Sequence, residues 1–459
     1  MVFVDSKRID VRNMALFFIG KIISVLGSGM FTFVAGLTIL KMTGSGSSFA
    51  ISLICGSLPR VLLAPFAGII ADRMNRRKLM IASDVAGMAV MLLTFAATVI
   101  MTDSLLPIYV SLALLNVCST FYSVAVSSSL LQLVNQDQIQ RAGSLNQMAS
   151  SAGNILAPVL GGILYAFLPL SVFTLMNGAA FLVSTIVTVL LIFRPQTARA
   201  DAVDAEADAG AAAAEAASAG AKPGTIRHML AAMRSDLSAG FAYVRTNPAV
   251  STLLKFVFWI NFFMASLGVL LPYVVVQTLN LSSEQFGTIE AMEAVGVLLM
   301  SLIMSIRKQS KDHVRPLARG LYIMSVLLLA VALPLLFSFN NGVNFVYYMA
   351  VMLAIGVSII SVNIPLSVFM QTTIDEQYRG RVFGLVDTFA GAIVPLGMLI
   401  VGYLVDLVPL WTLPVVSGVA VAVITFFGHR NLRKHTGVSE PKSKATLGSG
   451  IVQGGEVGV

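Results

Sequence analysis

The chain has 459 residues, of which 57% are hydrophobic and only 11% are charged. A soluble globular protein of this size needs many more polar side chains to cover its surface, so the composition excludes that class and predicts a membrane protein. The net charge of +8 does not indicate a nucleic-acid partner, because the positions of the basic residues are those expected from membrane topology.

A bilayer core requires about 20 apolar residues per helix, and twelve segments of the sequence meet this requirement. They cover residues 13–40, 48–71, 78–101, 105–133, 142–167, 170–193, 249–278, 284–306, 317–338, 343–372, 382–407 and 410–429. The start of the chain lacks the short apolar core and cleavage site of a signal peptide, so we expect insertion to rely on the first span.

Basic residues are distributed unevenly along the predicted spans. All but four of the 30 Lys and Arg residues lie in the N-terminus, the even-numbered loops or the C-terminal tail, or within three residues of a segment end that borders such a loop, and the exceptions are Lys21, Lys41, Arg60 and Lys255. Because cytoplasmic loops of membrane proteins carry the excess of Lys and Arg, this distribution places both termini in the cytoplasm. It predicts a multi-pass protein of the inner (cytoplasmic) cell membrane.

The hairpin between the second and third segments reads GIIADRMNRRK, from Gly68 to Lys78. Gly68 is expected to let a neighbouring helix approach closely, and Asp72 to bond amides at a helix end or to pair with Arg76. Together with Arg73 and Arg77, Arg76 holds the hairpin on the cytoplasmic side.

This pattern, G-x-x-x-D-R-x-x-R-R, resembles the loop 2–3 signature of the major facilitator superfamily. The resemblance implies an all-α membrane protein with twelve transmembrane helices in two six-helix pseudo-repeats. It also implies that the hairpin docks on helix eleven and braces the outward-facing state by closing the cytoplasmic side. Asp84, near the start of the third segment, is expected to tie that helix to the hairpin.

The fourth segment argues against the usual proton-driven drug exporter, whereas the fifth segment argues for an exporter. The family's proton-driven drug exporters usually carry an arginine in helix four, whereas here that segment has no charge and Asn116 is its candidate polar group. The fifth segment resembles the antiporter motif G-x-x-x-G-P-x-x-G-G, with Ala157 in place of a glycine. In the family that motif marks exporters and packs against helix eight, and the alternative is an ordinary face of small packing residues. Its residues are Gly153, Pro158, Gly161 and Gly162.

The two halves of the sequence repeat each other. Matching residues lie 234 to 238 positions apart, as in Lys21 and Lys255 or Pro158 and Pro395. A duplicated six-helix unit explains this register, and it predicts a cavity between the halves. We expect a bundle at 1–194, a cytoplasmic linker with an amphipathic helix at 195–247, a second bundle at 248–430 and a disordered tail at 431–459.

The sequence from Asp375 to Gly384 resembles the loop 10–11 signature of a narrower group, which includes the bacterial macrolide and multidrug efflux permeases. Arg379 and Arg381 belong to this signature. The resemblance adds them to the residues of the hairpin that are predicted to hold the cytoplasmic side closed, called the conformational latch here.

Ionisable side chains inside membrane spans are costly, so each one requires a reason. Glu290 and Glu293 lie three residues apart on one face of helix eight, where two carboxylates in a medium of low dielectric resist being ionised together. They are therefore the candidate proton carriers, and the alternative is a structural pair bonded to helix five or to Arg60. Asp387 is a third candidate, although an ion pair with Lys255 is the favoured interpretation.

The remaining polar residues of the spans are candidates for the substrate cavity. Lys21 either reaches the cytoplasmic interface or faces the cavity, and Arg60 lies mid-span, facing protein or water. With Asn116 and Lys255, the further cavity candidates are Asn261, Asn363 and Gln371.

The sequence predicts a transporter and not an enzyme. It has no P-loop, no metal-ligand pattern and no cofactor motif, and its histidines (His228, His313, His429 and His435) are predicted to lie in cytoplasmic segments. We expect a monomeric secondary active transporter that exports small amphiphilic or drug-like compounds by alternating access, in exchange for protons. A facilitator importer, a lipid or siderophore transporter, and a non-transporting membrane receptor are the alternatives.

Overall fold

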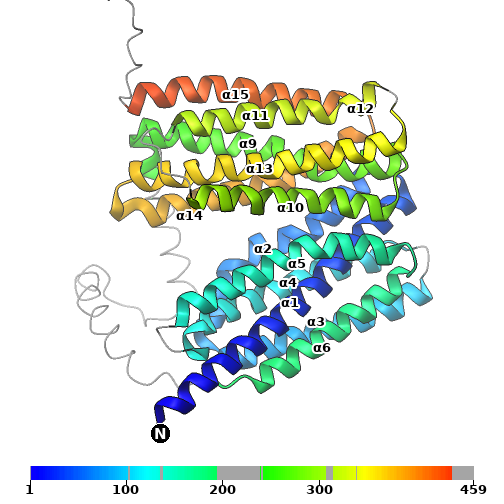
Figure 1. Ribbon diagram of the computed structural model, residues 1–459, viewed down its shortest axis with the longest axis vertical. Helices are drawn as coiled ribbons and strands as arrows, with labels where there is room; N and C mark the ends of the chain where they lie inside the picture. The colour runs from blue at the N-terminus through cyan, green and yellow to red at the C-terminus, as the bar shows by residue number, and fades with distance from the viewer. Residues whose placement is uncertain are drawn as a thin grey trace, which may run out of the picture.

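Long helices make up most of the computed structural model (Figure 1). The structure describes residues 2–101, 104–134, 138–193, 238, 241–306, 314–337 and 339–436. Most of the predicted linker and tail lies outside these residues. His228 and His313 also lie outside them. The sequence predicts a cytoplasmic segment for His429, and the structure places it near the end of the last helix, within its membrane-length segment.

Twelve helical segments of the described chain are long and apolar enough to cross a membrane, which confirms the predicted all-α fold with twelve spans. The helices of the first half are α1 (Val2–Thr43), α2 (Gly46–Arg73), α3 (Arg76–Ile100), α4 (Leu106–Leu133), α5 (Ile139–Tyr165) and α6 (Leu170–Leu190). Those of the second half are α9 (Pro248–Pro272), α10 (Ser283–Ile306), α11 (Val314–Val331), α12 (Leu333–Leu336), α13 (Asn341–Thr373), α14 (Glu376–Val405) and α15 (Thr412–Thr436). A π-helical turn, η2 (Tyr273–Thr278), extends α9, and α12 extends α11.

Local sequence explains where several helices begin. Asn75 caps α3 by accepting hydrogen bonds from the amides of Arg77 and Lys78, and Asn340 caps α13 through the amide of Val343. Between α1 and α2 the chain turns at Gly44, whose φ of 63° lies in the left-handed region that glycine adopts without strain.

The helices form two bundles, drawn one above the other in Figure 1. In the first bundle α1 packs against α5 and α6, and α3 packs against α4 and α6. In the second bundle α10 and α11 pack against α13, and α9 packs against α14 and α15. The two bundles meet mainly through α5 with α10 and through α2 with α14.

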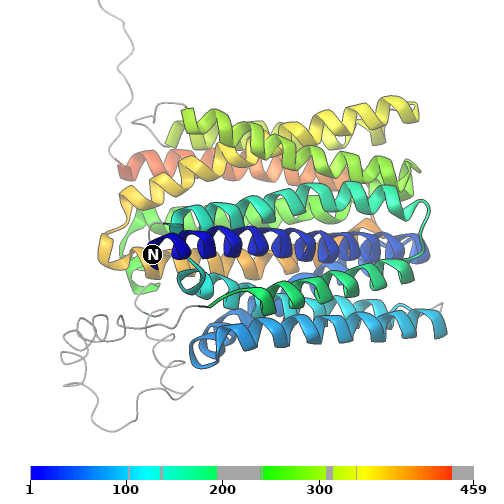
Figure 2. The ribbon, with the colours of Figure 1, turned by 60° about the horizontal axis from the view of Figure 1, so that its bottom comes forward.

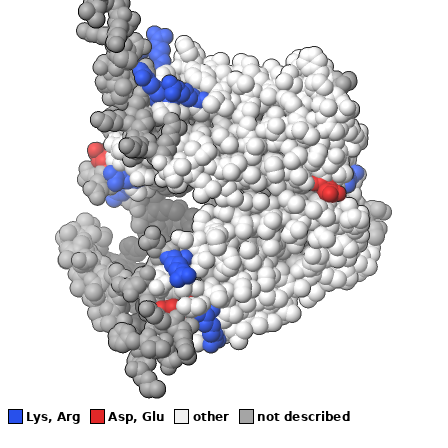
Figure 3. Space-filling model, viewed as in Figure 1, with Lys and Arg blue, Asp and Glu red and all other residues white. Residues whose placement is uncertain are grey.

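The two ends of the molecule differ. One end, called the terminal end here, carries Val2 and Thr436, and the opposite end, called the far end, carries the start of α2 and of α10 (Figures 1 and 2). The ribbons of the two bundles diverge toward the terminal end and converge at the far end (Figure 1). On the face shown in Figure 3, Lys and Arg gather mainly at the terminal end, while the sides of both bundles are almost free of charge.

Candidate functional site: a cavity between the two bundles

A cavity of about 470 Å³ lies between the bundles. All but four of its lining residues come from the first bundle, and the exceptions are Gly268, Pro272, Phe286 and Glu290. Three of the predicted cavity residues line it, namely Lys21, Arg60 and Asn116. Of the two positions that the sequence left open for Lys21, the structure therefore shows the one on the cavity wall.

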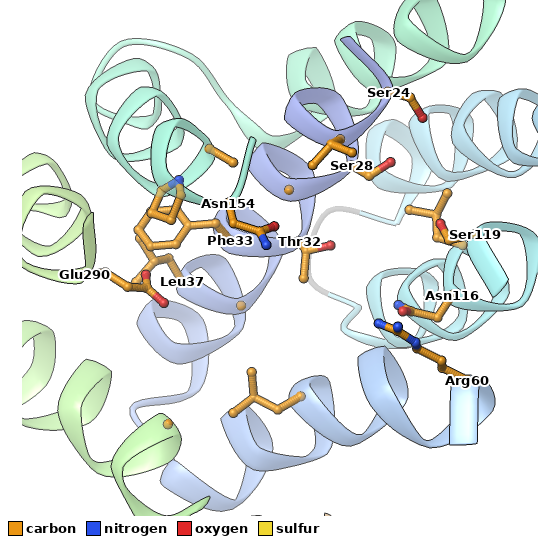
Figure 4. A pocket seen from close by; sticks show the side chains of 18 of the residues that line it. Ser24, Ser28, Thr32, Phe33, Leu37, Arg60, Asn116, Ser119, Asn154 and Glu290 are labelled. Carbon is orange, nitrogen blue, oxygen red and sulfur yellow. The ribbon is translucent and has the colours of Figure 1, made fainter. Parts of the chain in front are cut away.

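The first bundle contributes a polar wall that sequence reasoning missed. Ser24, Ser28 and Thr32 follow one another at intervals of four residues on α1, so they share one face of that helix, and all three line the cavity (Figure 4). Asn154 of α5 and Ser119 of α4 add an amide and a hydroxyl. The four-residue spacing was the signal in the sequence that would have identified the α1 residues.

Glu290 stands on the wall contributed by the second bundle, across the cavity from Arg60 (Figure 4). Its Oε2 atom is buried and has no hydrogen-bond partner in the described part of the chain. The alternative that Glu290 forms a structural pair with Arg60 is therefore not what the structure shows. A carboxyl oxygen left without a partner inside a membrane protein is costly, which is typical of a functional group.

Glu293 lies next to Glu290 but lines a different space. A second cavity of about 210 Å³ is lined by both glutamates and by Met264, Met352 and Met398. It shares Gly268, Pro272, Phe286 and Glu290 with the central cavity. Glu290 therefore stands at the junction of the two cavities, one helical turn from the second carboxyl group.

The other predicted residues lie elsewhere. Asn261 and Asn363 line a third cavity of about 200 Å³ between α9, α11 and α13, inside the second bundle. Lys255 and Gln371 line none of these three cavities, and Gln371 donates to Ser367 on its own helix. The side chain of Asp387 lies outside the described part of the structure, so its pairing with Lys255 stays a prediction.

Asp84 is in the interior of the first bundle, where it is only 1% exposed. It accepts a 2.7 Å hydrogen bond from Ser184 of α6. This bond ties α3 to α6, whereas the sequence predicted a tie between α3 and the hairpin after α2. The Nζ of Lys21 lies 5.6 Å from the centre of the Tyr122 ring, whose hydroxyl is 3.2 Å from the Ser184 hydroxyl. Asp84 thus lies behind the part of the wall that carries Lys21.

The motif residues of α5 make the closest contact between the bundles. A Cβ atom added to Gly162 would collide with the carbonyl oxygen of Ser283, and one added to Gly287 would collide with that of Pro158. Both clashes are with backbone, so only glycine allows α5 and α10 to approach this closely. Nearby, the rings of Phe33 and Phe286 stack with centres 5.4 Å apart.

The far end is held by polar bonds between the bundles. Lys41 donates to the Ser283 hydroxyl at 2.7 Å, and Gln277 donates to the Leu40 carbonyl at 2.6 Å. Asp406, which follows α14, caps the start of α2 and was not predicted from the sequence. Its carboxylate accepts from the Gly46 amide at 2.8 Å, the Ser47 amide at 3.1 Å and the Ser45 hydroxyl at 2.8 Å.

A carboxylate at a helix N-terminus is stabilised by the free amides there and by the helix dipole. Partial burial would by itself raise the pKa of Asp406, but the hydrogen bonds from Gly46, Ser45 and Ser47 outweigh it and hold the pKa below its usual value. The stability that these bonds contribute is therefore fully present above the usual pKa of an aspartate. It is lost only as the pH falls through the lowered pKa that Asp406 has in the folded protein. Asp406 therefore stays ionised between about pH 5 and pH 8, and its bonds to the start of α2 persist over this range.

Replacing Asp406 with asparagine should weaken closure of the far end by about 1 kcal/mol, the usual contribution of such a cap. The expected result is roughly five-fold faster hydrogen exchange at the amides of Gly46 and Ser47. Asn340→Ala, which removes a cap inside the second bundle at the same end, is the matched control and should leave these amides unchanged. Equal exchange in wild type and Asp406→Asn would show that the cap does not hold the bundles together.

At the terminal end, α2 and α14 lie farther apart. In the described part of the structure, no atom beyond the local helix backbone lies within 4 Å of a Cβ placed on Gly68 or on Gly384, whereas a Cβ on Gly402 would collide with Ala50 at the far end. The close approach expected at Gly68 is therefore absent here, because the bundles diverge at that end. Within the hairpin, Arg77 donates to the Val189 carbonyl of α6, and the side chains of Asp72 and Arg73 lie outside the described part.

The family model of the Major Facilitator Superfamily matches residues 17–398. The chain belongs to this superfamily. As a major facilitator protein it is a secondary transporter with a small-molecule substrate and not an enzyme, which confirms the family predicted from the hairpin.

Among curated facilitators, an uncharacterized transporter of Bacillus subtilis (strain 168), YfiS, is 23% identical over 86% of this chain and 87% of its own length. Macrolide efflux protein A of Streptococcus pyogenes is 20% identical over 84% of this chain and 88% of its own length. Both matches therefore cover most of each relative's length.

Solved structures confirm the facilitator fold. The nucleoside transporter NupG superposes with a TM-score of 0.67 at 11% identity, over 92% of this chain and 99% of its own. A bacterial homologue of the iron transporter ferroportin, described as inward-facing, superposes with a TM-score of 0.64 at 14% identity, over 91% and 99%. These identities are too low to carry more than the fold.

Proposed function

We propose that this transporter exports small amphiphilic compounds by alternating access, in exchange for protons. The observation that carries the proposal is Glu290, whose buried and unpartnered Oε2 lies on the wall of the central cavity. A carboxyl group in this position can bind a proton when the cavity faces one side of the membrane and release it on the other. Glu293 provides a second acceptor one helical turn away.

Two findings support export, and a third supports an amphiphilic substrate. The sequence of α5 resembles the family's antiporter motif, and its residues Pro158 and Gly162 form the contact with α10. The chain is similar over most of its length to macrolide efflux protein A. The central cavity combines polar groups with the rings of Phe33, Phe49 and Phe286, a surface suited to an amphiphilic molecule.

We also propose that the terminal end faces the cytoplasm, since Lys and Arg gather there (Figure 3). The structure then corresponds to an inward-facing state, closed at the far end by the Gly162 contact and the Asp406 cap. The chain works as a monomer in the inner membrane, with the domain division 1–194, 195–247, 248–430 and 431–459.

The hairpin after α2 is proposed to latch the opposite state. Asp72 and the hairpin arginines (Arg73, Arg76 and Arg77) would meet the start of α14, which carries Arg379 and Arg381, when the terminal end closes. Asp72→Asn should then reduce transport and leave equilibrium binding intact, and loss of membrane insertion instead would contradict this role.

Everted membrane vesicles from a host without its own efflux pumps test the function. When respiration acidifies the lumen, an exporter should accumulate a fluorescent amphiphile inside the vesicles, and a protonophore should release it. Accumulation only in right-side-out vesicles would identify an importer. Movement that is insensitive to the protonophore in either orientation would rule out proton coupling.

A further inference from the structure

The charged side chains of the central cavity are distributed unevenly between its walls. Lys21 and Arg60 belong to the first bundle, and Glu290 faces them from the second (Figure 4). These three are the charged residues among the described residues that line this cavity. A ligand bound there would meet positive charge on one wall and a carboxyl group on the other.

Arg60, like Glu290, has no hydrogen-bond or ion-pair partner among the described residues. Its side chain is exposed, lines the cavity and is drawn close to Asn116 in Figure 4. A charged residue inside a membrane span is costly, and partners inside the protein normally offset that cost. Asp84 does not offset it, because it is buried behind Lys21 and is bonded to Ser184. The wall of the first bundle therefore keeps an uncompensated positive charge.

Hydroxyl groups of the same wall suit the same kind of ligand. Hydroxyl groups of Ser24, Thr32 and Ser119 line this wall and can donate to an acidic group. Farther toward the far end, the lining becomes apolar, with Phe33, Leu37 and Phe49. The cavity thus has a cationic, hydroxyl-rich part and an apolar part.

We propose that the central cavity binds amphiphilic organic anions. The acidic group lies against Arg60 and Lys21, and the apolar body extends toward Phe33 and the ring of Phe286. Glu290, on the opposite wall, repels the acidic group and so favours this orientation over the reverse one. The inference rests on the proposed role of this cavity as the substrate site, and it narrows the substrate class.

Three fluorescent probes that share one pyrene body and differ in charge test this preference for anions. Pyrenebutyrate, pyrenebutanol and pyrenebutylamine differ only in the end group, which at pH 7.5 is negative, neutral and positive. Equilibrium binding to the purified protein in lipid nanodiscs, corrected with empty nanodiscs, needs no gradient and no direction of transport. It therefore separates this inference from the proposed proton-coupled export, which the vesicle assay tests.

Wild-type protein should bind the carboxylate about tenfold more tightly than the alcohol, as expected for a charge-assisted hydrogen bond, and the amine more weakly than both. Arg60→Gln should remove most of this preference, Arg60→Lys should keep part of it, and Lys21→Gln should reduce it. Arg430→Gln, which removes an exposed arginine of α15 outside the cavity, should change nothing.

Tighter binding of the amine would overturn the inference, and so would a carboxylate preference that survives both Arg60→Gln and Lys21→Gln. Binding of none of the three probes would also overturn it. Each variant is compared only after gel filtration shows the same elution as wild type, so that misfolding is not read as lost affinity.

Discussion

Replacing Glu290 with glutamine should abolish gradient-driven accumulation of substrate in everted vesicles, with a loss of about 100-fold, the effect of removing a proton-transfer group. Glutamine has nearly the same shape, so the cavity and its ligand contacts remain. Glutamine cannot bind and release a proton on the wall of the central cavity, and the rate should therefore lose most of its dependence on pH between about 5.5 and 8. Exchange of labelled for unlabelled substrate, which needs no net proton movement, should continue.

Two further variants serve as comparisons for Glu290→Gln. Glu293→Gln should give a smaller loss, because Glu293 lines the second cavity and not the central one. Glu284→Gln removes an exposed carboxyl at the far end of the same helix and should leave both accumulation and pH dependence as in wild type. Unchanged pH dependence in Glu290→Gln would remove this residue from the coupling scheme.

A second large effect is expected when Gly162 is replaced by valine. The new side chain would collide with backbone atoms of Ser283 and Glu284, which belong to a membrane helix and have little freedom to move. Overpacking of this kind costs about 1–3 kcal/mol, enough to shift the population by roughly 5- to 150-fold toward a state with an open far end. Transport should fall accordingly, because the cycle can no longer close that end.

Spin labels on Phe167 and Ser282, both exposed at the far end of the molecule, measure this opening after Cys55 and Cys118 are replaced by serine. The distance between the labels should increase in Gly162→Val. Gly143→Val is the matched control on the same helix, since among the described residues no atom beyond the local helix backbone lies within 4 Å of a Cβ at that position. An unchanged distance in Gly162→Val would contradict the idea that this contact closes the far end.

Helix positions were predictable because the lipid bilayer imposes a strong rule on span length and composition. The segment expected at 284–306, for example, is α10, Ser283–Ile306. The glycines of α5 were identified because close helix packing demands small residues at fixed intervals.

Helix orientation was harder to predict, since apolar residues cover all sides of a membrane helix and no polar stripe marks the face toward a cavity. Asn261 and Asn363 illustrate this, because both line a cavity inside the second bundle and not the central one. Asp406 was missed for another reason. Its partners at the start of α2 are 359 to 361 residues away in the sequence, and no local pattern reports that distance.

The wall of the central cavity comes almost entirely from the first bundle, whereas Glu290 and Glu293 come from the second. Under the proposed mechanism, the choice of cargo and the use of an energy source are thus encoded in different halves of one gene. A hybrid made from two homologues would inherit its cargo from the parent of its first half and its proton dependence from the other parent. A new cargo range could then evolve by exchange of half a gene, without rebuilding the groups that carry the proposed coupling.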